Sequence, residues 1–403
     1  MTNDITSPTA AGPLQGIRIV DLTQIIAGPL TTQLLAEQGA TVVKVEPLTG
    51  DLLRAGRTAG FGANYANNNR GKRSLAIDVK LEAGRKIVLD LARTADVFVE
   101  NFRPGVCDRL GIGEADIRSV SPDIIHVSIN GFGSTGPYAD RPALDPVIQA
   151  YTGMVAGQMS DVSPSPDFVR TMVADKTTAY TAAQAITAAL YARDHGAGGQ
   201  HVEVPMLDAT LAWFWVDGMS DHTEASKTSA RGRVVDGYRL VDTSDGHVVY
   251  YTASNSQLTG LLQALNRSDL VADGRYNNLR SLARNPEFRA LVDRAITAGF
   301  AALTTEDAVD RLAGEAVPCG PILERGEVAS DPQVVHNGCL VEWDHPVAGR
   351  LRQPAPPVRF GATPTALRRE IDELGASTVD ILIELGRNDD QIADLRSDGV
   401  IAS

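Results

Sequence analysis

The chain has 403 residues, 43% of them hydrophobic, which exceeds the usual length of a single domain and predicts two. Its net charge of −13 argues against a nucleic-acid partner, because a polyanion would be repelled on average. The three cysteines are too few and too scattered for a disulfide framework and indicate a reducing compartment. Without a signal-peptide pattern or an apolar run of roughly 18 residues that could enter a membrane, we expect a cytoplasmic protein.

Short β-branched segments alternate with helical patterns through the first half of the chain. The predicted strands are residues 17–22, 41–46, 74–78, 96–100, 124–129 and 201–205. Helical patterns cover residues 30–37, 81–95 and 176–193. This alternation predicts an α/β fold, in which a mainly parallel sheet lies between helices in a Rossmann-like large domain. Since no G-x-G-x-x-G follows the first predicted strand, a dinucleotide site is not predicted.

The sequence changes character after Asp221, where a polar segment begins. Residues 238–251 have the pattern of two strands joined by Asp245 and Gly246, a pair that favours a hairpin turn. Helical patterns follow from residue 256 to residue 313. We therefore predict a large domain over residues 13–224 and a second, smaller α+β domain over residues 225–330.

Asp175 stands directly before the long predicted helix and has two interpretations. Aspartate is favoured at a helix N-cap, because its carboxylate accepts hydrogen bonds from the free N–H groups of the first turn. The same position keeps a carboxylate ionised, and an anionic carboxylate in a pocket can attack a thioester carbonyl to form a covalent acyl intermediate. Asp145 is a candidate partner in a carboxylate pair.

Two further segments contain residues suited to coenzyme A. Residues 64–80, which end at Lys80, carry four cations and one anion. This basic run is either a solvated loop or a phosphate site, since Arg and Lys suit the pyrophosphate and 3′-phosphate of CoA. Residues 100–105 follow a predicted strand, at the edge where parallel sheets bind ligands, and Arg109 comes one turn later.

The seven histidines are scattered, and none is spaced three or four residues from another. The sequence therefore predicts no metal site and no Ser–His or Cys–His constellation.

Eight motifs occur along the chain in a recognisable order. They are LQGIRIVDLT (14–23), GATVVKVEP (39–47), NRGKRSLAIDVK (69–80), ADVFVENFRPGVCDRLG (95–111), SINGFGSTGPYADRP (128–142), GQHVEVPMLD (199–208), VPCGPI (317–322) and SDPQ (330–333). With these motifs the chain resembles the family III CoA-transferases over nearly its whole length. That family includes formyl-CoA transferase, carnitine CoA-transferase and α-methylacyl-CoA racemase.

The resemblance implies an acyl-CoA:carboxylate CoA-transferase, with Asp175 as the covalent nucleophile. Its substrates would be an acyl-CoA and a free carboxylic acid, and no cofactor would be bound permanently. The family's CoA contacts carry over to Ile26, Ile77, Lys80, Asn101, Phe102, Arg103 and Arg109. Pro47 and Pro142 stand where formyl-CoA transferase has basic residues, and Arg141 is a candidate substitute. The resemblance also implies that residues 331–403 return to the large domain and that two ring-like subunits interlock as a homodimer.

Two other functions compete with CoA transfer. The α-methylacyl-CoA racemases use a histidine at the position of Leu144, and leucine cannot exchange a proton at the α-carbon. A non-enzymatic CoA-binding protein would keep the basic run but would not need Asp175. The sequence therefore favours the transferase over the racemase, and both over the binding protein.

Overall fold

The computed structural model describes residues 12–54, 62–159, 164–226, 237–273, 284–365 and 370–402, together with residues 275, 278, 282 and 368. Most of the polar segment that follows Asp221 lies outside these residues. The chain divides into two compact units: Met1–Trp215 with His336–Ser403, and Val216–Val335. Each unit has its own hydrophobic core.

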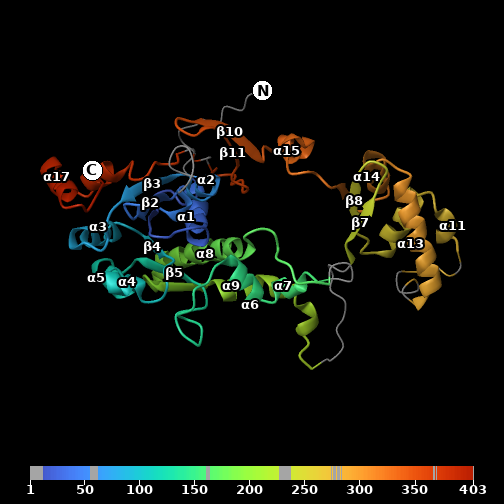
Figure 1. Cartoon of the computed structure of the whole chain (residues 1–403), viewed down its shortest axis with the longest axis horizontal. Helices are drawn as coiled ribbons and strands as arrows, with labels where there is room; N and C mark the ends of the chain where they lie inside the picture. The colour runs from blue at the N-terminus through green and yellow to red at the C-terminus, as the bar shows by residue number, and fades with distance from the viewer. Residues whose placement is uncertain are drawn as a thin grey trace. The chain divides into compact units, whose positions relative to one another are not determined.

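The first unit is built on a six-stranded sheet in the order β3-β2-β1-β4-β5-β6, and every neighbouring pair of strands is parallel (Figure 1). The strands are β1 (Arg18–Asp21), β2 (Thr41–Glu46), β3 (Lys72–Ala76), β4 (Val97–Glu100), β5 (Ile125–Asn130) and β6 (His201–Pro205). All six predicted strands are confirmed, with ends within two residues of those expected.

Helices cover both faces of this sheet. The core of one face lies beneath α1 (Ala27–Glu37), α6 (Asp145–Tyr151), α8 (Val173–Ala192) and α9 (Met206–Trp215). The core of the other face lies beneath α3 (Glu82–Ala92), α5 (Glu114–Val120), α16 (Thr378–Glu384) and α17 (Asp389–Ser397). Because neighbouring side chains in a strand point to opposite faces, Ile19 packs into the first core and Val20 into the second.

Two helices that reach the carboxyl edge of the sheet begin three residues earlier than predicted. Helix α1 begins at Ala27 and includes Pro29, and α8 begins at Val173. A proline fits the first turn of a helix because an N–H there has no partner within the helix. For α1, Ala27, Gly28 and Pro29 therefore lie in the first turn of the helix.

The first unit contains several shorter elements. They are α2 (Ala63–Asn69), α4 (Val106–Leu110), α7 (Met154–Gly157), β10 (Leu340–His345) and β11 (Gly349–Pro354). Helix α15 (Pro332–Asn337) begins in the second unit and ends in the first. Strands β10 and β11 form an antiparallel hairpin. Trp343 of β10 packs on Tyr65 of α2, and Gln353 of β11 donates a hydrogen bond to the carbonyl of Ala66. These contacts attach the C-terminal segment to the N-terminal part of the unit.

The second unit contains an antiparallel sheet in the order β7-β8-β9. Its elements are β7 (Arg239–Asp242), β8 (His247–Tyr250), α10 (Asn255–Ala264), α11 (Ser268–Val271), α13 (Pro286–Ala301), α14 (Thr305–Gly314) and β9 (Cys319–Pro321). The predicted hairpin is confirmed, because β7 pairs with β8 across Asp245 and Gly246. Among the helices of the described residues, none is both long enough and apolar enough to span a membrane.

Candidate active site

A cleft of about 290 Å³ opens where strands β1, β4 and β5 end. It is lined by residues 24–27, 101–104, 129–131, 139 and 141–144, with Asp175 and Met206. The strand order of the sheet reverses between β1 and β4. In open parallel sheets the ligand crevice forms at the carboxyl ends of the strands that flank such a reversal. The cleft therefore lies where this fold favours a ligand.

The structure brings five of the predicted site residues together in this cleft. They are Ile26, Asn101, Phe102, Arg103 and Asp175. The other three do not line it. Lys80 and Arg109 are exposed, the first just after β3 and the second on α4. The side chain of Ile77 is fully buried in the core, so a contact from this residue to a ligand would have to use its backbone.

The first two cations of the basic run, Arg70 and Lys72, are neither in a solvated loop nor free to bind a phosphate. Arg70 is buried and paired with Glu37, and Lys72 is buried with its Nζ 2.9 Å from a carboxylate oxygen of Asp21. Arg73 pairs with a carboxylate of α16. Arg70 and Lys72 are thus neutralised inside the protein and cannot reach a ligand. A positive balance in the sequence gave no sign of this, because the partner acids lie far along the chain.

Asp175 is not the N-cap of α8. The helix begins at Val173, so Asp175 is the third residue of its first turn, and the N-cap position belongs to Met172. The free backbone N–H of Asp175 donates instead to Oδ2 of Asp145, 3.0 Å away. The N-cap interpretation is therefore wrong, since Asp145 from the start of α6 performs the capping role that the sequence suggested for Asp175.

Asp145 is itself held in place from the opposite side. Gln149, one turn later in α6, donates from Nε2 to Oδ1 of Asp145 at 2.6 Å. The Gln149 side chain is fixed in turn by the N–H of Val169, which donates to its Oε1 at 3.0 Å. Asp145 and Asp175 are thus neighbours, and the geometry of the pair is set by α6 and by the segment before α8.

The pKa of the Asp175 carboxyl group lies close to neutral pH. Its residue is 8% exposed, and burial together with the charge of Asp145 raises the pKa of Asp175 to about 7. The backbone N–H of Ala27 favours the anion and limits the rise of this pKa. The expectation that the helix start alone keeps Asp175 ionised at neutral pH is therefore replaced by a balance in which both protonation states are populated at pH 7.

The first turn of α1 is the part of the site that the sequence reasoning missed. Ala27 contributes a backbone N–H and no functional side chain, so no residue type marks it. Its neighbour Gly28 does leave a signal, because a Cβ there would lie 2.3 Å from Cβ of Thr23. Glycine is required for this close approach, which lets α1 begin directly behind the loop that follows β1.

A fixed loop forms another side of the cleft. After β5, the side chain of Asn130 accepts from the N–H of Gly133 at 2.6 Å and donates to Glu203 at 2.8 Å. Further along, Arg141 lies over the ring of Tyr138 and donates to the hydroxyl of Tyr151. Arg141 and Asp175 therefore line the same cleft.

Comparison with known proteins identifies the family. The model of CoA-transferase family III matches residues 14–378. The chain belongs to CoA-transferase family III. Membership explains why five residues carried over from the family meet in one cleft. It also makes the protein an enzyme that transfers CoA between carboxylic acids and uses a CoA thioester as substrate.

Curated relatives and solved structures agree with this assignment. Human succinyl-CoA:glutarate CoA-transferase is 35% identical, over 96% of this chain and 90% of its own. Acetyl-CoA:oxalate CoA-transferase of Acetobacter aceti is 30% identical, over 93% of this chain and 97% of its own. The crystal structure of a CAIB/BAIF family protein from Brucella suis superposes with a TM-score of 0.81 at 29% identity, and covers 93% of this chain and 100% of that one.

The buried carboxyl of Asp175 predicts an effect on stability. In the folded protein its pKa is about 7, whereas an unfolded aspartate titrates near 3.8. The contribution of the Asp175 carboxyl to the free energy of unfolding is largest below pH 3.8, where the group is protonated in both the folded and the unfolded state. This contribution is lost as pH rises to 7. Asp175→Asn cannot ionise, so we expect it to raise the free energy of unfolding at pH 8 by up to about 4 kcal/mol, and to have no such effect at pH 4. Denaturant unfolding at both pH values measures this difference. A loss of stability at pH 8 would contradict it.

Proposed function

We propose that this family III enzyme moves CoA from an acyl-CoA donor to an acceptor carboxylate through covalent intermediates on Asp175. The observation that carries the proposal is the position of Asp175, which is buried, next to a second acid and open to a cleft at the carboxyl edge of the sheet. A carboxylate in that setting is a nucleophile that needs no separate base once it has lost its proton.

The proposed reaction is a relay of acyl groups between three nucleophiles. Asp175 attacks the donor thioester, which forms a mixed anhydride and releases CoA thiolate. The thiolate attacks the Asp175 carbonyl, which releases the donor acid and leaves an aspartyl-CoA thioester. The acceptor carboxylate attacks that thioester, which forms a second mixed anhydride on Asp175 and releases CoA thiolate again. The thiolate then takes the acceptor acyl group from the second anhydride and regenerates Asp175.

The N–H of Ala27 supports this relay. It lines the same cleft as Asp175 and favours the Asp175 anion, so it is suited to stabilise the negative charge that develops when a thiolate or carboxylate attacks the Asp175 carbonyl. Fixed backbone donors of this kind stabilise an oxyanion without reorganisation during the reaction.

Racemisation is the weaker candidate. Leu144 lines the cleft beside Asp145 and is 57% exposed, so the position of the racemase histidine is open to a substrate but holds an alkyl side chain. Among the described residues that line the cleft there is no histidine at all. Two groups that exchange a proton on opposite faces of an α-carbon are needed for racemisation, and the lining favours a transferase instead.

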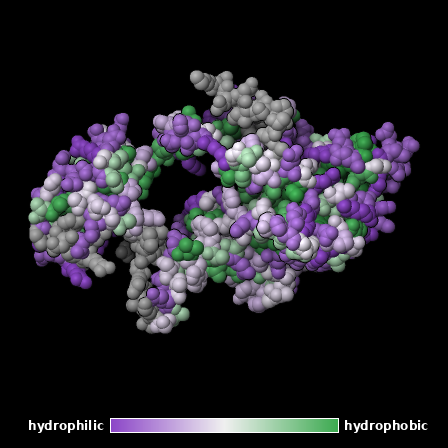
Figure 2. All heavy atoms as spheres, turned by 180° about the vertical axis from the view of Figure 1, so that it is seen from behind, coloured by the Kyte–Doolittle hydropathy of each residue, from purple (hydrophilic) through white to green (hydrophobic). Residues whose placement is uncertain are grey.

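The proposal extends to assembly and domain organisation. We propose a cytoplasmic, interlocked homodimer, with a Rossmann-like large domain over 13–224 completed by 331–403 and a small domain over 225–330. The strand order of the parallel sheet supports the Rossmann-like description. Exposed aromatic residues on α8 and α9 support a second subunit: Tyr180, Tyr191, Trp213 and Trp215. Figure 2 shows hydrophobic residues at the surface among the hydrophilic ones on the face that it displays.

Covalent labelling tests the nucleophile. When the enzyme is incubated with acyl-CoA and no acceptor, we expect acyl or CoA mass on the peptide that contains Asp175, and hydroxylamine should convert that residue to a hydroxamate. Asp175→Asn should be folded, unlabelled and essentially inactive, because an amide cannot form the anhydride. Peptide mass spectrometry and a turnover assay measure both effects. A folded Asp175→Asn enzyme that still transfers CoA would end the proposal.

Substitution of surface cations tests the CoA site. Lys80→Ala and Arg109→Ala should each raise the KM for acyl-CoA about tenfold and leave the KM for the free acid nearly unchanged, since a charge-assisted hydrogen bond contributes roughly 1.5–3 kcal/mol. Arg93→Ala is a matched control, because Arg93 ends α3 and therefore lies toward the amino edge of the sheet. Steady-state kinetics with both substrates varied decides the matter. If neither variant differs from the control, these residues are not part of the site.

The pH profile tests the pairing of the two acids. Asp145 raises the pKa of Asp175, so Asp145→Asn should move the rising limb of kcat/KM from about pH 7 to lower pH, by about one unit. Asp398→Asn, which removes an exposed acid at the far end of the chain, should leave the profile in place. If the rising limb of kcat/KM in Asp145→Asn stays at the wild-type pH, that limb does not report the titration of this carboxylate pair.

A further inference from the structure

We propose that Asp51 is a positioning residue for this reaction, which holds Ile25 in a left-handed backbone conformation so that the N–H of Ala27 faces Asp175. The inference rests on the proposed function, and adds a residue that lies outside the cleft and touches neither substrate nor Asp175.

Ile25 has a φ of +71°, in the left-handed region. An L-residue there brings its Cβ close to the following carbonyl oxygen, and a β-branched side chain has less freedom to relieve the crowding. Such residues persist only where surrounding contacts hold them, and they cluster at functional sites. Ile25 lies in the wall of the cleft, two residues before Ala27.

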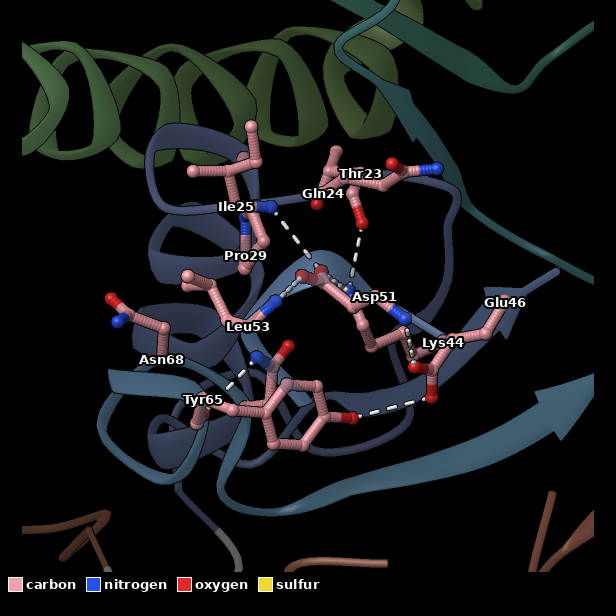
Figure 3. Close-up of polar contacts among 12 residues, drawn as sticks. Thr23, Gln24, Ile25, Pro29, Lys44, Glu46, Asp51, Leu53, Tyr65 and Asn68 are labelled. Atoms are coloured by element: carbon pink, nitrogen blue, oxygen red, sulfur yellow. Dashed lines mark hydrogen bonds and ion pairs between the residues drawn. The ribbon is translucent and has the colours of Figure 1, made fainter. Parts of the chain in front are cut away.

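Asp51 supplies the contact that holds this conformation. Its Oδ2 accepts the N–H of Ile25 at 3.2 Å (Figure 3). Lys44 Nζ lies 3.2 Å from the same oxygen and donates to the carbonyl of Thr23 at 2.7 Å. Lys44 therefore binds the carbonyl of Thr23, and Asp51 binds the N–H of Ile25. These are the two residues on either side of Gln24.

Gln24 itself is held by a residue from the neighbouring strand end. The Asn101 side chain accepts the N–H of Gln24 at 2.8 Å and donates to its carbonyl at 2.8 Å. The loop after β1 is thus bound at three consecutive residues before it enters α1. A loop held in this way delivers the first N–H of the helix, that of Ala27, to one position.

The Asp51 carboxylate is fixed before any substrate arrives. Its Oδ1 accepts the N–H of Leu53 at 2.9 Å, and its own N–H donates to Oε2 of Glu46 at 3.1 Å. Arg54 holds Glu46 through an ion pair at 2.7 Å. Asp51 is 2% exposed, so water does not compete for these bonds. The group therefore acts as a rigid support for Ile25.

Relaxation of Ile25 to a negative φ would turn the chain as it enters α1 and move the N–H of Ala27 away from Asp175. Misplacement of a group at a reacting centre by about 1 Å can reduce a rate about a hundredfold. Glycine adopts a positive φ at no steric cost. Glycine at position 25 should therefore make Asp51 largely unnecessary, which gives the inference a test that separates positioning from stability.

The experiment compares Asp51→Asn in two backgrounds, with Ile25 and with Ile25→Gly. The measurement is the single-turnover rate at which acyl-CoA labels Asp175 in the absence of acceptor. We expect Asp51→Asn to slow labelling at least tenfold beside Ile25 and less than threefold beside Gly at that position. A purely structural role would give equal losses in both backgrounds. Equal losses, or no loss in either, would overturn the proposal.

Two further arms keep the result decisive. If Asp51→Asn does not fold, Ile25→Pro is used, since proline cannot adopt a positive φ and lacks the N–H that Asp51 accepts, so it removes both the conformation and its support while Asp51 keeps its side chain. A folded Ile25→Pro enzyme that labels at the wild-type rate would refute the proposal.

The pKa of Asp175, followed by NMR of its carboxyl carbon, gives a readout independent of activity. It should rise in Asp51→Asn and return toward the wild-type value with Ile25→Gly added. If acyl-CoA does not label Asp175 in the wild-type enzyme, the covalent mechanism is rejected. The NMR comparison of the Asp175 pKa then tests the positioning role of Asp51 by itself.

Discussion

The backbone N–H of Ala27, in the first turn of α1, favours the carboxylate anion of Asp175, in the first turn of α8. Each of these turns carries partial positive charge from its free N–H groups. That N–H favours the anion at a place where burial and Asp145 both disfavour it, and the effect of burial and Asp145 is the larger. Because the resulting pKa of about 7 lies at neutral pH, a small displacement of either helix start would change the protonation state of Asp175.

The buried charges under the loop after β1 are best understood as part of this arrangement. Asp21, Lys44, Asp51 and Lys72 are all at most 3% exposed. Burial opposes the charge on Asp21, but Lys72 and Lys44 lower its pKa, whereas burial lowers the pKa of Lys72 to about 8. Buried ion pairs add little net stability, because desolvation offsets their attraction. They do fix geometry, and the atoms that these groups hold belong to the turn that leads into α1.

The sequence predicted the parts of the molecule that depend on local patterns. The six strands followed from β-branched runs, and the β7–β8 hairpin from Asp245 and Gly246, because both signals lie within a few residues. The place of Asp175 in the cleft followed from the family resemblance, since its local sequence equally suggested a cap. The structure then assigned that cap to Asp145, thirty positions earlier in the chain.

What the sequence did not predict depends on pairings across long stretches of chain. Arg70 and Lys72 belong to a basic run, yet their partners Glu37 and Asp21 lie on other elements, and only the folded sheet brings them together. The strain at Ile25 has no signature in a β-branched residue type, which by itself predicts extended backbone. The support from Asp51 arrives from the loop after β2. Site geometry carried by backbone groups is therefore invisible until the fold is known.

The raised pKa of Asp175 suits the chemistry proposed for it. A carboxylate of ordinary pKa would be almost wholly ionised at pH 7, but it would be weakly basic and correspondingly weak as a nucleophile. With a pKa of about 7, roughly half of the molecules retain the anion at pH 7, and each anion is far more basic than an exposed aspartate. The twofold loss of the reactive form is small beside a basicity increased by about three orders of magnitude, even if only part of that increase appears in the rate. Asp145 thus has two effects from one position: it caps α8, and it keeps the nucleophile basic.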